Sequence, residues 1–131
     1  MKRLQERLQG TEQALDRLQE VIEISIPSMV ERDAGIQRFK VSFQAAWKTA
    51  KEYLYRVEGL DVVSPKGVLR SSRELGILSE DETALGLQMT DDRNLTVYAY
   101  EEQLAEEIFY KIPQYYQLMR EWMRRISGRV C

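Results

Sequence analysis

One arginine stands alone in a strongly acidic part of the sequence. Between positions 80 and 107 there are nine carboxylate residues, and Arg93, which is followed by Asn94, is the single basic residue. A guanidinium fork binds phosphate, and a carboxamide hydrogen-bonds a base or a ribose, so this pair is a candidate nucleotide site. The alternative is an ion pair between Arg93 and Asp91 or Asp92, with the glutamates favouring helix N-termini.

A second candidate site lies on a short predicted helix over residues 65–75. Ser64 and Pro65 are typical of a helix start, where free backbone N–H groups can bind a phosphate. The basic residues along this helix are Lys66, Arg70 and Arg73. The alternative is a solvated basic face.

A further basic cluster ends the last predicted helix. For this cluster we favour a purely structural role, because cations suit that end of the helix dipole. Its members are Arg120, Arg124, Arg125 and Arg129.

The sequence contains no histidine. This excludes Ser-His-Asp and Cys-His nucleophiles and histidine-ligated zinc. Asp91 and Asp92 diverge by about 100° on a helix, so they form a poor Mg²⁺ site. No Walker loop or G-x-G-x-x-G motif occurs. We therefore expect no metal and no cofactor, and any catalysis would have to use carboxylates, Lys, Arg or Tyr.

These candidate residues must be positioned by helices. Apolar residues recur at three- and four-residue spacing, while Gly and Pro are too few for a many-stranded β fold. We predict helices over 2–24, 31–58, 65–75, 80–90 and 101–127, a kink at Pro113, and a loop over 91–100. The fold class is therefore all-α: an antiparallel up-and-down bundle of about five helices, three long and two short, in a single domain over 1–131.

The second predicted helix is apolar on two sides. Val41, Ala45 and Tyr55 lie off its main apolar face. Because a small bundle has few helices to cover a second face, we expect a homodimer. The aromatic residues of the last helix, including Tyr110, are expected in the core or at an interface.

Composition bounds the location and the partners. The formal net charge is −2, so an anionic ligand requires a local basic patch. The only cysteine is Cys131, and the first twenty residues interleave charges with leucines, unlike a signal peptide or membrane span. We expect a cytoplasmic protein with no membrane partner.

Two segments, with a third between them, resemble a known family. They are IQRFKVSFQAAWKTAKEY at 36–53, DRNLTVYAYEEQLAEE at 92–107 and, between them, SPKGVLRSSRELGIL. Together they resemble the nucleotidyltransferase substrate-binding-protein family, a branch of the HEPN superfamily, over roughly residues 30–115. The resemblance implies a five-helix homodimer that associates with a small nucleotidyltransferase encoded beside it, often as a toxin–antitoxin-like pair.

The resemblance also implies roles for individual residues. Active HEPN ribonucleases have an arginine followed after four to six residues by a histidine, and in related toxins a tyrosine two residues further on receives AMP. Arg93 and Asn94 match the start of this motif, Tyr98 stands at the histidine position, and Tyr100 matches the modified tyrosine. A phenol with a pKa of about 10 is a poor general base at neutral pH.

We therefore predict a non-catalytic or degenerate HEPN-type subunit. It would bind a nucleotidyltransferase and present a nucleotide or polynucleotide through Arg93, Asn94 and Tyr98, with Tyr100 as a modification target. The second basic cluster, Lys66, Arg70 and Arg73, would contribute to the same cleft. The alternatives are a ribonuclease toxin acting without histidine and a purely structural dimerisation bundle.

Overall fold

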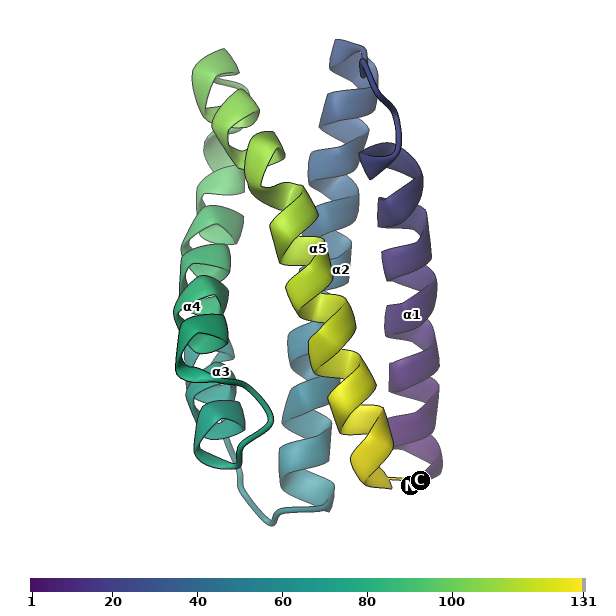
Figure 1. Ribbon diagram of the computed structural model, residues 1–131, viewed down its shortest axis with the longest axis vertical. Helices are drawn as coiled ribbons and strands as arrows, with labels where there is room; N and C mark the ends of the chain where they lie inside the picture. The colour runs from purple at the N-terminus through teal and green to yellow at the C-terminus, as the bar shows by residue number, and fades with distance from the viewer. Residues whose placement is uncertain (131) are drawn as a thin grey trace.

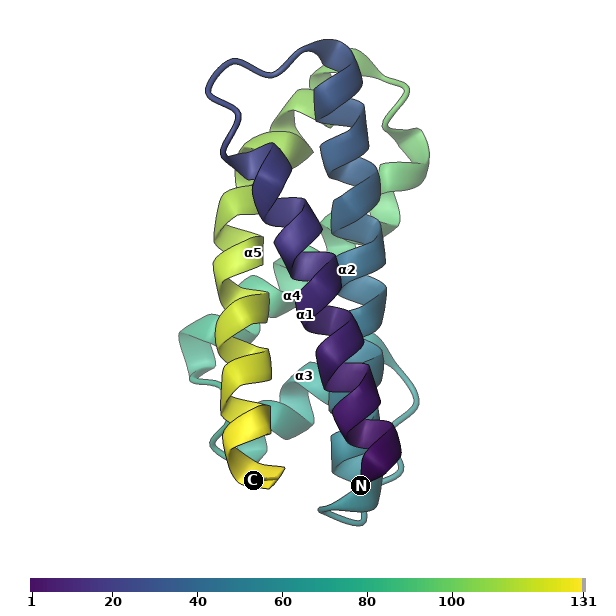
Figure 2. The ribbon, with the colours of Figure 1, turned by 90° about the vertical axis from the view of Figure 1, so that its right-hand side faces the viewer.

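The protein is a helical bundle in which four helices run alternately up and down (Figures 1 and 2). The computed structural model describes residues 1–130; Cys131 lies outside the described residues. Its helices are α1 (Lys2–Ile22), α2 (Met29–Arg56), α3 (Pro65–Glu74), α4 (Glu80–Leu95) and α5 (Glu102–Val130), with a 3₁₀ turn, η1 (Thr96–Tyr98), before α5. Short α3 crosses one end of the bundle (Figure 2). Residues 1–130 contain no strand, so the predicted all-α fold is confirmed.

Most helix ends follow from local sequence. Ser64 Oγ accepts a hydrogen bond from the backbone N–H of Gly67 at 3.1 Å, which confirms the predicted helix start there. Ser79 forms a capping box with Glu82 at the start of α4. Gly76 adopts a φ of +75°, a left-handed conformation that terminates α3.

The second helix starts earlier than predicted. Ser28 forms a second capping box with Glu31, so α2 begins at Met29 rather than at residue 31. The predicted start at residue 31 rests on apolar spacing, whereas a serine followed three residues later by a glutamate is itself the signature of a helix start.

The predicted loop over 91–100 is wrong in its first half. Helix α4 continues to Leu95, and η1 follows it directly. The cause is a contact that is distant in sequence: buried Asp92 on α4 accepts a hydrogen bond from the Tyr115 hydroxyl on α5. In addition, Thr96 Oγ1 donates to the Arg93 carbonyl at 2.6 Å and so caps the helix end.

The core lies between α1, α2 and α5 and is closed at one end by α3. Phe39 of α2 stacks on Tyr115 of α5 with ring centroids 5.7 Å apart. Trp122, fully buried, donates from Nε1 to Ser72 Oγ of α3 at 3.1 Å. Tyr110 is exposed, unlike the other aromatic side chains predicted for the core of α5. Pro113 lies within α5 without interrupting it.

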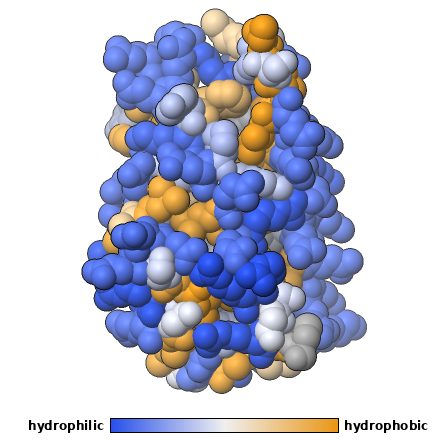
Figure 3. Space-filling view, in the orientation of Figure 1, coloured by the Kyte–Doolittle hydropathy of each residue, from blue (hydrophilic) through white to orange (hydrophobic). Residues whose placement is uncertain are grey.

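The surface is mostly hydrophilic on the face seen in Figure 3, with apolar atoms confined to strips between polar side chains. None of the described helices has an apolar stretch long enough to cross a membrane.

Two helical glycines give a matched test of the packing. A Cβ added at Gly10 would meet no atom within 4 Å, whereas one at Gly86 would lie 2.7 Å from Cδ2 of buried Leu69. We expect Gly10→Ala to raise the free energy of unfolding by about 1 kcal/mol through helix propensity. Gly86→Ala should lower it by about 1–3 kcal/mol through overpacking. Urea denaturation measures both, and changes of the same sign would contradict the packing described here.

Candidate functional site

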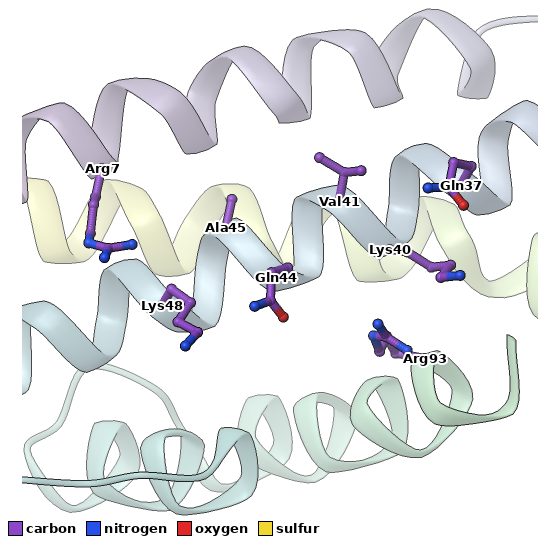
Figure 4. A pocket seen from close by; sticks show the side chains of 8 residues that line it. All are labelled: Arg7, Gln37, Lys40, Val41, Gln44, Ala45, Lys48 and Arg93. Carbon is purple, nitrogen blue, oxygen red and sulfur yellow. The ribbon is translucent and has the colours of Figure 1, made fainter. Parts of the chain in front are cut away.

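A groove of about 560 Å³ runs between α1, α2 and α4 (Figure 4). Four of the eight residues that line it are cations and none is a carboxylate. The lining residues are Arg7, Gln37, Lys40, Val41, Gln44, Ala45, Lys48 and Arg93. We call this the cationic groove.

Helix α2 supplies the floor of the cationic groove. Lys40, Gln44 and Lys48 are four residues apart and therefore form one row along the helix. Val41 and Ala45 form a neighbouring row on the side nearer α1 (Figure 4). The apolar core face of the same helix points away from the groove, so burial of that face fixes the lysines at the surface.

Polar contacts between α1 and α2 position Arg7. The Arg7 carbonyl oxygen accepts hydrogen bonds from Thr11 Oγ1 at 2.9 Å and from Thr49 Oγ1 at 3.2 Å, and both hydroxyls are buried. Arg7 Nε is buried, lies 3.9 Å from Glu52 Oε1, and has no hydrogen-bond partner among the described residues. The Glu52 carboxylate lies closer to Arg3, at 3.1 Å. Arg7 therefore keeps donor capacity beside the groove.

A buried hydrogen-bond network positions Arg93. The Tyr115 hydroxyl donates to Asp92 and accepts from Gln88 Nε2 at 3.0 Å, while Lys111 Nζ lies 3.5 Å from the Asp92 carboxylate. Burial, reinforced by Asp92, raises the pKa of Tyr115 above its ordinary value, so the phenol stays protonated and donates. Asp92 faces inward, and the next residue, about 100° further round the helix, faces the groove.

Arg93 makes no ion pair with any of residues 1–130. Asp91 pairs instead with Lys66, with 2.7 Å between Oδ1 and Nζ, and Asp92 is bound by Tyr115 and Lys111. The interpretation in which a neighbouring aspartate neutralises Arg93 is therefore wrong. In Figure 4 its side chain extends from α4 toward α2.

Asn94 and Tyr98 are not among the residues that line the cationic groove, whereas Tyr100 lies in a hollow that adjoins it. Asn94 is exposed at the end of α4, and Tyr98 is 54% exposed in η1. Tyr100 is 84% exposed and lines a smaller hollow of about 250 Å³ with Gln37 and Lys40, two residues that also line the groove.

The second predicted basic cluster lies apart. Lys66 is engaged by Asp91, and Arg70 and Arg73 are exposed on α3. None of the three is among the residues that line the cationic groove. Their part in ligand binding stays a prediction.

The arginines at the end of α5 are held within the molecule. Arg125 pairs with Glu82 at 2.7 Å, Arg120 with Asp16, Arg124 with Glu121, and Arg129 donates to the Leu75 carbonyl. This agrees with a structural role.

Residues 1–130 contain no group of three or more carboxylate or cysteine side chains that could hold a metal ion.

Sequence reasoning missed three of the four groove cations, Arg7, Lys40 and Lys48. One signal was present: residues 34–51 contain four basic residues and no carboxylate, although 31% of the chain is charged. An acid-free basic stretch on an otherwise core-forming helix marks a face that attracts anions.

Comparison with known proteins matches the chain to a family model and to solved structures. Residues 6–128 match the model of a family described as nucleotidyltransferase substrate binding protein like. A Thermus thermophilus protein known from its crystal structure is 48% identical with a TM-score of 0.86, covering 88% of this chain and 98% of that one. A Haemophilus influenzae protein is 18% identical with a TM-score of 0.78, covering 92% and 98%, and is described as showing the fold of a substrate binding domain of a nucleotidyltransferase. No curated protein sequence matches the chain.

The different partners of Arg93 and Tyr115 predict different effects on stability. Arg93→Ala removes no internal ion pair, so the free energy of unfolding should change by less than about 0.5 kcal/mol. Tyr115→Phe removes the hydroxyl that donates to buried Asp92 and should cost about 1–3 kcal/mol. Urea denaturation of both variants measures this, and a large loss in Arg93→Ala would show a bracing role instead.

Proposed function

We propose that this chain, which belongs to the nucleotidyltransferase substrate binding protein like family, is a non-catalytic subunit that holds an anionic substrate for a nucleotidyltransferase. The observation that carries the proposal is the cationic groove. It gathers Arg7, Lys40, Lys48 and Arg93 without a carboxylate, on a chain whose formal net charge is −2.

The chemistry of the groove suits a nucleotide or a polynucleotide. Cations held close together repel one another, and phosphate groups between them relieve that repulsion. Arg93 offers a fork for two phosphate oxygens, while Gln37 and Gln44 offer carboxamides to a base or ribose. The volume of about 560 Å³ lies within the range of small-molecule sites.

The proposal includes a homodimer. Val41 of α2 is 51% exposed, and Ala45 is partly exposed beside it. These apolar side chains lie off the core, where a second copy would remove them from water. Because Val41 and Ala45 also line the cationic groove, the grooves of the two copies would open at the subunit boundary.

We assign the groove a binding role because the chain has no imidazole to move a proton. Tyr98 stands where the related ribonucleases have histidine, and a phenol does not act as a general base near neutral pH. Arg93 has no ion-pair partner among residues 1–130, and this favours ligand binding over the purely structural alternative.

Tyr100 is a proposed acceptor for AMP from the partner enzyme, and its 84% exposure leaves the hydroxyl accessible. In such a transfer the phenol oxygen bonds to the α-phosphorus of ATP, and the bond from that phosphorus to the bridging oxygen breaks. Pyrophosphate leaves with the electron pair, and the phenolic proton passes to solvent.

Association is tested by size-exclusion chromatography with light scattering. The purified chain should show a dimer mass alone and should co-elute with the nucleotidyltransferase encoded beside it. Val41→Glu places a charge on the exposed α2 face and should give a monomer, whereas Tyr110→Glu, at an exposed position on α5, should not. Separate elution of the two proteins would contradict the proposal.

Modification is tested by intact-mass spectrometry after incubation with that nucleotidyltransferase, ATP and Mg²⁺. We expect added mass in whole AMP units on the wild type and on Tyr98→Phe, but none on Tyr100→Phe, which lacks only the acceptor oxygen. AMP added equally to Tyr100→Phe would show that the acceptor lies elsewhere.

A further inference from the structure

We infer that the ligand of the cationic groove is a segment of single-stranded polynucleotide several nucleotides long, rather than a mononucleotide. This inference rests on the proposed function and narrows it. Two observations support it. Hollows adjoin the groove in both directions, and an exposed tyrosine lies at each end of the joined hollows.

Toward the C-terminal end of α2, the groove continues into a second hollow. This hollow has a volume of about 530 Å³ and shares Arg7 and Lys48 with the groove. It adds three further cations, Arg3, Lys51 and Arg56, against two carboxylates, Glu52 and Asp61. Glu52 pairs with Arg3 at 3.1 Å and with Arg56 at 3.5 Å, so Lys51 is the added cation that most needs an external anion. Together the groove and this hollow hold seven cations and two carboxylates.

In the other direction, the groove adjoins the hollow that contains Tyr100, through the shared residues Gln37 and Lys40. We call the three joined hollows the basic track. Lys40 and Tyr55 are fifteen residues apart on one helix, which corresponds to about 22 Å along its axis. A mononucleotide in the groove would leave the cations of the second hollow without phosphate, while the Tyr100 hollow adds no further cation and has one carboxylate, Asp33.

An exposed tyrosine lies at each end of the basic track. Tyr55 is 56% exposed at the C-terminal end of α2, and Tyr100 is 84% exposed beyond η1. A cationic groove that follows the phosphates, with aromatic rings on which bases stack, is the arrangement that binds single strands. In a duplex the base faces are already stacked on one another, so these rings would have nothing to bind.

The test uses fluorescence anisotropy with the full-length chain and labelled oligothymidylates of two to ten nucleotides, with ATP as competitor. Affinity should rise with length until the basic track is filled, at about four nucleotides or more. The dependence of affinity on salt should also steepen with length. The slope of the logarithm of the binding constant against the logarithm of salt concentration should grow by about 0.7 for each phosphate contacted. Decamer binding should fall roughly fivefold or more in Tyr55→Ser.

The variants separate this inference from the proposed function. Lys51→Gln should weaken the decamer and leave ATP and dinucleotide binding unchanged, whereas Arg93→Ala should weaken all three ligands. Arg124→Gln, the same loss of charge on α5 outside the three hollows, should weaken none. ATP binding as tightly as the decamer through Arg93 would overturn the inference and leave the proposed function standing. If no ligand bound, or if Arg93→Ala had no effect, both would fail.

Discussion

The buried hydrogen bond between the Tyr115 hydroxyl and Asp92 sets the geometry on which the site depends. It ties the last turn of α4 to the middle of α5 and fixes the rotation of α4 about its own axis. A carboxylate in this environment is costly to bury unless its oxygens are bonded, so alternative rotations that expose or strand Asp92 are disfavoured. Arg93 faces α2 as a direct result.

Helix α2 performs two tasks at once. One face carries Phe39 and Phe43 into the core, and the opposite side carries the lysines of the groove. Packing of the apolar face against α1 and α5 holds Lys40 and Lys48 in place, and neither lysine forms an ion pair within residues 1–130. Helix α2 is therefore both held rigid by the core and the carrier of the groove lysines. A preorganised binding site requires charged groups held in this way.

The features of the fold that could be predicted are those encoded locally. The starts of α3 and α4 follow from Ser64 and Ser79 and their neighbours, and the three long helices follow from apolar periodicity. The extension of α4 through Arg93 could not be predicted, because it depends on Tyr115, which is 23 residues away from Asp92 in sequence. Arg93 was found by its isolation among acids, whereas Arg7 and Lys48 become neighbours only once α1 and α2 pack together.

Segregation of charge also governs how a ligand would arrive. The four cations of the groove on a chain of net charge −2 leave a net −6 on the remaining residues. A polyanion that approaches from most directions is repelled, and only encounters that face the groove gain attraction within a Debye length, about 8 Å at physiological salt. The surface therefore selects the orientation of productive collisions and resists indiscriminate adsorption to cellular nucleic acid, which a uniformly basic protein of this size would not do.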